Sequence, residues 1–482
     1  YRVEEIAMSG TPVSSSPVIA VTEPVPVANA PVVEVKPDSA NDTIATQKAE
    51  EKPQTNEVFY MSTQEKGATL MSSMTNMVNS IIGAGVLSIP STVRKAGIVG
   101  SFILLSLSLY LSLEGAHMLS DTSVYTKEDS YGSIGKKVGV AAAGLIGDIS
   151  MIVFDLGISV AYLLILFQQT IDLLHSWCHI AVETLATWKP LICSLIALFF
   201  AFPLLGLPTM DSLRFTSGFA IVCIVMFAMI SIIKGVSQLV KGGLEYSMFP
   251  NDWSLLPSAV SVFFTSMCCH VNIPKMTAEL RMPSTSRFAN KTKKMHRVNT
   301  LAFLTCGGIY FIVGAFGYLA YGNKIGANLL DNFSQDQAWY LNIVKCAYGI
   351  VMLFSYPVLS YAALVTFDKL CFKQPRPAAR RYAEAFVWTA ISTFIAIVLP
   401  DLDTIFGITG SLCGILLNFA LPAYYYIAMS KKEKAKEKSS QVPFFTISKG
   451  RLNFSWFIFY LGIVADVVFT GLQIKDVIGK LS

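Results

Sequence analysis

Two stretches of this chain place polar and helix-breaking residues inside otherwise apolar segments, and the first reads N-S-I-I-G-A-G-V-L-S-I-P from residue 79 to residue 90. Gly83 and Gly85 flank Ala84 in its centre. Glycine weakens a helix and lets its backbone open, which a membrane tolerates only where protein or a wet cavity covers the freed groups. Free N–H groups and a positive dipole end at the start of a half-helix suit an anion. We therefore predict that Gly83, Ala84 and Gly85, with the neighbouring Ser80, bind a substrate carboxylate; the alternative is that the glycines serve only close helix packing.

The second stretch, C-C-H-V-N-I-P-K-M-T-A-E-L from residue 268 to residue 280, concentrates ionisable side chains in a segment that is otherwise apolar. Isolated charge inside a membrane is costly, so such residues are functional candidates, and the proline interrupts the helix. We predict that His270, Asn272 and Lys275 contact the substrate. His270 and Glu279 are also candidates for carrying a coupling proton.

Another apolar segment contributes Asp155, a further candidate for carrying a proton. A lysine at membrane depth needs a nearby acid, because an unpaired ammonium there would lose its proton or reorganise the site. We expect Asp155 or Glu279 to compensate Lys275. For the remaining ionisable residues of the apolar segments, interhelical pairing or capping is favoured over a proton relay. These residues are Asp148, Lys345 and Asp466.

Composition identifies the class of protein. Hydrophobic residues make up 53% of the 482 residues and charged residues only 14%, whereas soluble domains carry about 25% charged residues. The chain is therefore a polytopic membrane protein, and its net charge of +5 is no sign of nucleic-acid binding. The nine cysteines lack metal-ligand spacing, and no nucleophile motif or phosphate loop is present. We expect neither an enzyme nor a cofactor, other than Na+ or H+ as a coupling ion.

Apolar segments long enough to cross a bilayer recur about eleven times. The first and the sixth are the interrupted ones, a spacing expected when two inverted five-helix repeats each contribute a discontinuous helix to one site. The sequence therefore predicts an all-α fold of about eleven transmembrane helices with broken first and sixth helices. The segments after the first lie at about residues 99–119, 140–171, 188–207, 213–234, 256–280, 299–321, 338–368, 384–400, 404–428 and 454–475.

The N-terminal stretch differs from the rest of the chain. Residues 1–66 are rich in proline and in acidic residues and poor in aromatic ones, so they cannot bury a core and we predict a disordered, acidic cytosolic tail. Residues 67–482 form the predicted transmembrane domain. Lysine and arginine gather in the loops that share a side with the tail, and the positive-inside rule places that side in the cytosol. An odd number of spans then puts the C-terminus outside the cell or in a lumen.

These motifs resemble the amino acid/auxin permease family, and within it the sodium-coupled neutral amino acid transporters and the fungal vacuolar amino acid transporters. The resemblance covers residues from about 67 to 475. Its most specific part is the string that begins at Asn79, an asparagine followed by small residues around a glycine pair. Further matches are Cys269, His270, Asn272 and Glu279-Leu280 in the sixth segment, Gly157 and Tyr162 in the third, and Lys345, Ser355 and Pro357 in the eighth.

The resemblance implies a LeuT-like fold that moves amino acids by alternating access, coupled to a cation gradient, in the plasma membrane or in a vacuolar or lysosomal membrane. It adds Tyr162 to the expected substrate site. It also implies a sodium site built from Asn79, Ser355 and backbone carbonyls at the glycine break, because sodium favours such oxygen ligands. If protons are the driving ion, as in the vacuolar relatives, His270 or Asp155 carries them.

The sequence departs from the family pattern at three positions. Lys275 stands where an aliphatic residue is expected, Pro274 comes one place early, and Asp155 replaces a frequent asparagine. These departures bear on the substrate class and on the coupling ion, and they leave the expected fold unchanged.

Two function hypotheses follow. The first is a secondary active transporter of neutral amino acids. The second is a membrane receptor that senses the same amino acid and signals through a cytosolic partner of residues 1–66. Deleting the tail separates the two, because a transporter keeps its flux. A channel is disfavoured, because the polar groups converge on one pocket and a pore needs rings of them along its length.

Overall fold

The structure, a computed structural model, describes most of the chain from residue 67 to residue 481. The described ranges are 67–208, 216–281, 288–334, 339–372, 374–399, 401–438 and 448–481. The predicted disordered tail, residues 1–66, lies outside these ranges, and so does the predicted contact of this tail with a cytosolic partner. Within these ranges the regular secondary structure is helical apart from one isolated β-bridge between Ala68 and Leu280, which confirms the all-α class.

Some of the helices are long enough to cross a bilayer by themselves, and short 3-10 or π segments join others into longer stretches. In chain order the elements are α2 (Leu70–Ile81), α3 (Gly85–Ala96), α4 (Ile98–Thr126), α5 (Tyr131–Val138), α6 (Ala141–Cys178), α7 (Val182–Ile196), η1 (Ala197–Ala201), α8 (Phe202–Leu205), α9 (Thr216–Lys241), η3 (Trp253–Leu255), α10 (Leu256–Ser266), η4 (His270–Asn272), α11 (Ile273–Glu279), α12 (Phe288–Tyr321), η5 (Gly322–Lys324), α13 (Leu329–Ser334), α14 (Trp339–Cys371), α15 (Ala378–Val398), α16 (Leu402–Thr409), η6 (Gly410–Gly414), η7 (Leu416–Ala420), α17 (Leu421–Lys438) and α18 (Lys449–Leu481).

The first span is broken at its glycines, as predicted. It consists of α2 and α3, which meet at an angle of 55°. Thr69 caps the start of α2 by accepting a hydrogen bond from the Ser72 N–H, and α2 ends before Gly83. Pro90 plays no part in the break, because it lies inside α3, where its ring packs against Gly317 of α12.

The sixth span is also broken, but the break precedes the proline to which we assigned it. The helix α10 ends at Ser266, and a single 3-10 turn, η4, leads into α11. Pro274 is among the first residues of α11, a position where its missing N–H would have had no helical partner. The proline therefore starts the second half-helix, while the interruption falls at residues 267–269.

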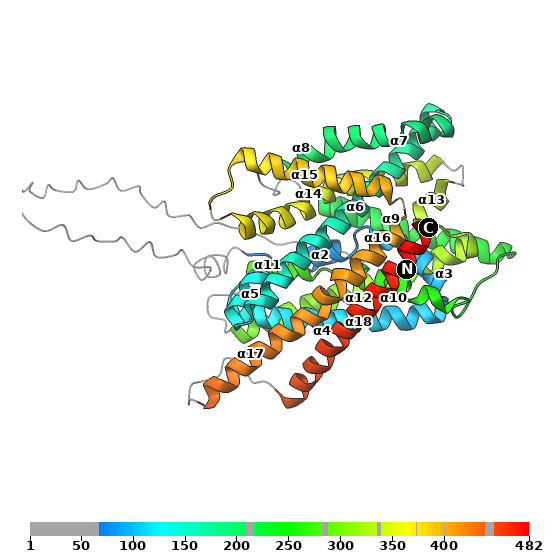
Figure 1. The fold of residues 1–482 in the computed structure, drawn as a ribbon. Helices are drawn as coiled ribbons and strands as arrows, with labels where there is room; N and C mark the ends of the chain where they lie inside the picture. Colours follow the sequence, from blue (N-terminus) through cyan, green and yellow to red (C-terminus); the bar gives the residue numbers. More distant parts are fainter. Residues whose placement is uncertain are drawn as a thin grey trace, which may run out of the picture. The chain divides into compact units, whose positions relative to one another are not determined.

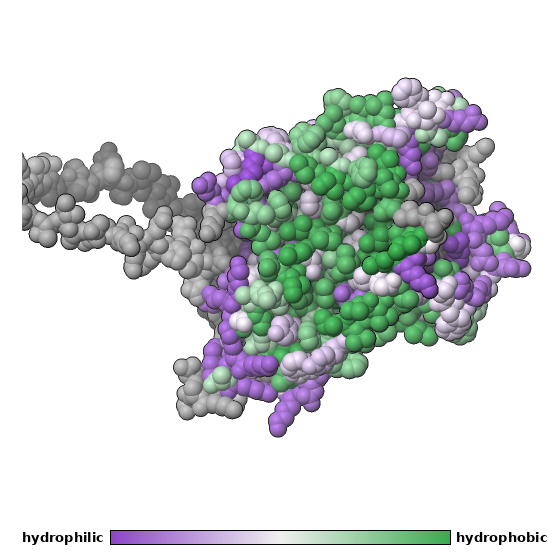
Figure 2. All heavy atoms as spheres, in the orientation of Figure 1, coloured by the Kyte–Doolittle hydropathy of each residue, from purple (hydrophilic) through white to green (hydrophobic). Residues whose placement is uncertain are grey.

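The side of the helix bundle is apolar enough to face lipid. Figure 2 shows hydrophobic residues over the side of the bundle and hydrophilic residues gathered toward its ends. Ten described helices are long and apolar enough to span a membrane, and the bent pair α2 and α3 makes an eleventh span. This number agrees with the count predicted from the sequence.

The third and tenth spans lie at the centre of the bundle. The helix α6 packs against α14, α15 and α16, and α10 packs against both α16 and α3. We call the end of the bundle where α2 begins, at Leu70, the entry face, and the end where α3 stops, at Ala96, the opposite face. Figure 1 shows α5 and the end of α17 toward the entry face and α13 toward the opposite face.

Candidate functional site

A small cavity of about 30 Å³ lies where the two broken spans meet. Six of the residues predicted to contact substrate line it: Ser80, Gly83, Ala84, Gly85, Tyr162 and Asn272. The sequence reasoning missed the rest of the wall, which is mostly apolar. These additional residues are Ile81, Phe154, Ile158, Thr265, Ser266, Cys268, Val271, Leu359 and Phe406.

Both glycines of the first break are in close contact with neighbouring spans. A Cβ at Gly83 would lie 2.5 Å from the Tyr162 hydroxyl oxygen. A Cβ at Gly85 would lie 2.8 Å from Ser266 Oγ, 3.0 Å from its Cβ and 3.2 Å from its Cα. A tyrosine tip can move aside, whereas the end of a packed helix cannot, so Gly85 is the less replaceable of the two.

The break leaves backbone donors unused at the cavity wall. The Gly83 N–H bonds to the Ile81 carbonyl at 3.0 Å, but in the described part of the chain the N–H groups of Ala84, Gly85 and Val86 donate no backbone hydrogen bond. Ser266 Oγ is buried beside Gly85 and likewise has no partner among the described residues. Donors at a helix start, together with a free hydroxyl, form a suitable site for a carboxylate.

Tyr310 of α12 holds the two breaks together, a role for which the sequence contains no signal. Its hydroxyl oxygen lies 2.7 Å from the carbonyl oxygen of Ile81 and 2.9 Å from that of Ser266, and its proton can be donated to either. A second link is a 3.4 Å hydrogen bond from the Asn272 amide to Ser80 Oγ. The ends of α2 and α10 are thus fixed to a common neighbour.

His270 does not line the cavity. It is fully buried, its Nε2 is 2.9 Å from the Ser112 carbonyl oxygen of α4, and its ring packs edge to face on Phe303 at 6.1 Å. In this structure His270 therefore holds the sixth-span break against α4, and its contact with the substrate stays a prediction.

The expected ion pair of Lys275 is wrong. Lys275 is exposed on α11 and forms no ion pair or hydrogen bond with any described residue. It needs no acid because its ammonium group reaches the surface, and it does not line the cavity. Glu279 is half-buried at the end of α11, where its carbonyl oxygen accepts a hydrogen bond from the Ala68 N–H at 2.9 Å.

Asp155 is the most isolated acid of the described chain. Its side chain is fully buried in α6 next to Phe154 of the cavity wall, and neither carboxyl oxygen has a hydrogen-bond partner among the described residues. Asn79 and Ser355, the proposed sodium ligands, are half-buried, and neither lines the cavity.

Two of the three remaining ionisable residues have the pairing or capping role expected of them. Asp148 accepts a 2.9 Å hydrogen bond from the Gly132 N–H and so joins α6 to α5. The Lys345 ammonium lies 3.5 Å from Asp172 Oδ2. For Asp466, Oδ1 has no hydrogen-bond partner within the described ranges.

An ion pair closes the bundle between the cavity and the opposite face. Lys95 Nζ lies 2.8 Å from Asp403 Oδ2, which joins α3 to α16. Asp403 also accepts a hydrogen bond from Ser91, and Phe406, one helical turn further along, lines the cavity. Toward the entry face, the bridge between Ala68 and Leu280 ties the two broken spans together. Specific contacts therefore join the broken spans to each other or to α16 on both sides of the cavity.

Asp403→Asn is expected to lower the melting temperature of the purified protein strongly, because it leaves the Lys95 ammonium buried without a counter-ion. Breaking such a pair on one side costs about 3–5 kcal/mol. The double variant Lys95→Met, Asp403→Leu should recover most of the loss, since no charge is then left unpaired. If the double variant melts no higher than Asp403→Asn, the ion pair is not the source of the stability.

A second polar cluster lies near the opposite face. Asn328 donates hydrogen bonds of 3.0 Å to Asp331 of α13 and 3.0 Å to Gln168 of α6. Burial, reinforced by the negative charge of Asp172, raises the pKa of Asp331 to about 7, against the opposing effect of Lys345. Because α13 lies outside the membrane spans, this acid can exchange protons with water.

The pH dependence of stability follows from this pKa. Between the unfolded pKa, about 4, and the folded pKa of about 7, folded Asp331 holds a proton that unfolded Asp331 has lost, so stability falls as pH rises through this window. Thermal unfolding in detergent should show a drop in melting temperature from about pH 5 to 8 that is several degrees larger in the parent than in Asp331→Asn. Asp252→Asn is the control, because hydrogen bonds from Ser254 lower the pKa of exposed Asp252. Equal pH slopes in the parent and Asp331→Asn would refute the assignment.

The described residues form up to eleven spans, two of them broken around a small cavity, and this arrangement resembles the architecture of transporters built from inverted repeats. The family model described as transmembrane amino acid transporter protein matches residues 66–466. The chain belongs to this family and is an integral membrane protein.

Two curated relatives are similar over most of their length. Amino acid transporter AVT6E of Arabidopsis thaliana is 25% identical over 429 residues, covering 84% of this chain and 83% of the relative. Vacuolar amino acid transporter 5 of Schizosaccharomyces pombe is 25% identical over 388 residues, covering 77% of this chain and 87% of the relative. Both are named as transporters, in agreement with the expectation that the chain is not an enzyme.

A solved structure has the same fold. MhsT in complex with L-phenylalanine aligns with a TM-score of 0.52 at 14% sequence identity, covering 83% of this chain and 98% of that chain. The LeuT-like fold implied by the resemblance is therefore confirmed.

Proposed function

We propose that the protein is a secondary active transporter that moves neutral amino acids across a membrane by alternating access. The observation that carries the proposal is the cavity at the two helix breaks, with the unused N–H groups of Ala84 and Gly85 and the unpartnered Ser266 hydroxyl in its wall. These donors suit the carboxylate of an amino acid. We propose that the amino group of the substrate contacts backbone carbonyl oxygens at the C-terminal ends of α2 and α10.

The choice of neutral substrates rests on the rest of the wall. Among the described residues, none of those lining the cavity carries a charge, and Phe154, Ile158, Val271, Leu359 and Phe406 provide apolar surface. A charged substrate side chain would be buried there without a counter-ion, which is costly. The names of the curated relatives support amino acids as the substrate class.

For the coupling ion the observations favour a proton bound at Asp155. A buried carboxylate without a partner is stable only when it is protonated or when a cation lies beside it. Asp155 follows Phe154 of the cavity wall in α6 but does not itself line the cavity, so the proposal places the proton site beside the substrate site and not within it. Sodium bound by Asn79 and Ser355 is the alternative, and His270 and Glu279 are further proton carriers to be tested after Asp155.

We place the protein in a vacuolar or lysosomal type of membrane with the entry face toward the cytosol. The name of the Schizosaccharomyces pombe relative supports the vacuolar type of membrane. The lysines and arginines of the loops support the cytosolic orientation of the entry face. In this orientation the C-terminus lies in the lumen.

The test is uptake of a panel of labelled amino acids into proteoliposomes containing the full chain, with pH and sodium gradients imposed separately. We expect accumulation of at least one neutral amino acid with the pH gradient. Accumulation with the sodium gradient alone would show that sodium is the coupling ion and would favour a site at Asn79 and Ser355 over Asp155. No uptake under either gradient would overturn the proposal and leave the receptor hypothesis. A chain lacking residues 1–66 should retain its uptake, because the cavity lies outside that segment.

A further inference from the structure

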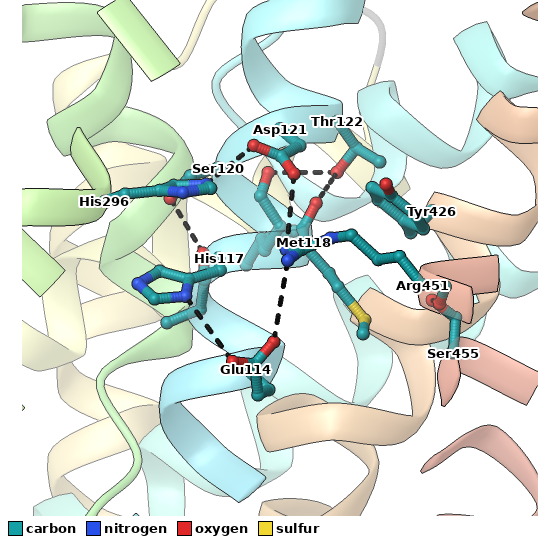
Figure 3. A network of polar contacts seen from close by, with 12 residues as sticks. Glu114, His117, Met118, Ser120, Asp121, Thr122, His296, Tyr426, Arg451 and Ser455 are labelled. Carbon is teal, nitrogen blue, oxygen red and sulfur yellow. Dashed lines mark hydrogen bonds and ion pairs between the residues drawn. The ribbon is translucent and has the colours of Figure 1, made fainter. Parts of the chain in front are cut away.

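A cluster of five charged or titratable side chains lies outside the cavity, toward the entry face (Figure 3). Glu114, His117 and Asp121 come from α4, His296 from α12 and Arg451 from α18. Figure 3 shows Arg451 between the two carboxylates and the two imidazole rings face to face beside them. The cluster therefore joins three helices that are far apart in the sequence.

The two imidazole rings of the cluster lie against each other, and each lies near a carboxylate. The two imidazole rings stack at 4.3 Å with planes 25° apart. His296 Nε2 lies 2.7 Å from Asp121 Oδ1, and His117 Nδ1 lies 3.9 Å from Glu114 Oε1. Each ring thus has its own carboxylate.

The charge count limits the site to a single proton. Two carboxylates and the Arg451 guanidinium, which lies 3.9 Å from Glu114 and 3.6 Å from Asp121, leave one negative charge when both imidazoles are neutral. One imidazolium makes the cluster neutral. A second would place two cations 4.3 Å apart, where they repel. Histidine is the side chain that makes this change between about pH 5 and 8.

Other groups that face the cluster do not alter this count. Thr300 Oγ1 lies 3.3 Å from His117 Nε2, and the Tyr426 ring of α17 packs under the Arg451 guanidinium at 5.4 Å. Further toward the entry face, Glu433 and Lys436 of α17 pair with each other at 2.9 Å. All of these groups are neutral or mutually neutralised.

The helices that carry the cluster also hold the two breaks. Ser112, whose carbonyl oxygen contacts His270 at the sixth-span break, precedes Glu114 by two residues on α4. Tyr310, which joins the ends of α2 and α10, belongs to the same helix as His296. The helices that carry the cluster are therefore the same helices that contact both breaks.

We propose that His117 and His296, with Glu114, Asp121 and Arg451, form a regulatory proton-binding site on the entry-face side. Binding of one proton completes the ion pairs between α4, α12 and α18 and slows the transport cycle. Loss of the proton leaves Glu114 and Asp121 with only Arg451 between them, and the helices separate more readily. This inference rests on the proposed transport function and adds to it an inhibition of transport at acidic pH.

The test is counterflow of a labelled neutral amino acid in proteoliposomes with the same pH on both sides, so that no proton gradient drives the flux. Across about pH 5 to 8, counterflow by the parent should fall toward the acidic end. The double variant His117→Gln, His296→Gln should remove that fall, because either ring alone can still bind the proton, giving counterflow at least about fivefold faster than the parent at the acidic end and equal to it at the basic end. His175→Gln, a change of an exposed histidine at the far end of α6, should keep the parent profile.

Two charge variants separate a proton site from a merely structural contact. Asp121→Asn makes the unprotonated cluster neutral, so the midpoint of the pH profile should move to lower pH. Arg451→Gln leaves two unbalanced carboxylates, so the midpoint should move to higher pH. A structural tie would lower the melting temperature of both variants and move neither midpoint.

Failure of the inference and failure of the proposed function are distinguishable. A parent with no counterflow at any pH contradicts the transport function itself. A parent that shows counterflow, together with a double histidine variant whose pH profile matches it, or charge variants whose midpoints move in the same direction, overturns the regulatory site alone.

Discussion

Gly85→Val is expected to abolish transport, with an initial rate of uptake at least about 100-fold below that of the parent. A Cβ at this position would already lie 3.0 Å from the Ser266 Cβ and 3.2 Å from its Cα. The two extra methyl groups of valine would push α3 and α10 apart or fill the carboxylate site. Either result removes the donors at the start of α3 from their positions around the substrate.

The matched control is Gly308→Val on α12. Gly308 is an exposed helical glycine with no atom within 4 Å of an added Cβ, so valine there should preserve uptake. Comparing the elution profiles of both variants in detergent separates misfolding from loss of transport. If the Gly85→Val protein folds and takes up the substrate with the affinity of the parent, the first-span break is not part of the substrate site.

Asp155→Asn should uncouple transport from the proton gradient. Asparagine nearly preserves the size of the side chain but cannot bind or release a proton, so accumulation driven by an imposed pH gradient should fall by about tenfold or more. Counterflow without a gradient should continue, because it requires the cavity and not the driving ion. The two assays are made on the same proteoliposomes.

Asp148→Asn, on the same helix, is the control for this prediction. Its amide oxygen can still accept the hydrogen bond that Gly132 donates to Asp148, so both assays should match the parent. Unchanged proton-driven accumulation in Asp155→Asn would exclude this residue as the carrier. His270→Gln and Glu279→Gln would then be examined in the same way.

The features that depend on local chemistry could be predicted from the sequence. The length and polarity of the segments indicated eleven spans, and the glycine pair located the first break at residues 82–84, where α2 gives way to α3. Proline was a poorer guide, because its effect depends on where it falls in a helix. Pro90 is accommodated inside α3, and Pro274 lies in the first turn of α11.

The features that depend on side-chain direction could not be predicted. His270 and Asn272 are two residues apart in the sixth-span break, yet Asn272 lines the cavity and His270 contacts α4. Which way each side chain faces is set by the 3-10 turn between α10 and α11. Tyr310 is another case, since one tyrosine in an apolar span gives no sign that its hydroxyl joins two helix ends.

The paired cluster of His117 and His296 also lay beyond sequence reasoning. The two residues are separated by 179 positions along the chain, and their rings meet only because α4 packs against α12. Each alone is a single histidine near the end of a span. Their significance comes from the stacking and from the carboxylates beside them, which are properties of the folded bundle.

The central claim is that amino acids pass through the cavity at the two helix breaks, and counterflow tests it most directly. Proteoliposomes with the full chain are loaded with an unlabelled neutral amino acid, and entry of the same labelled compound is followed without any ion gradient. The parent should show a transient accumulation of label that Gly85→Val lacks and Gly308→Val retains. Absence of that accumulation in the parent for every neutral amino acid tested, or its persistence in Gly85→Val, would contradict the claim.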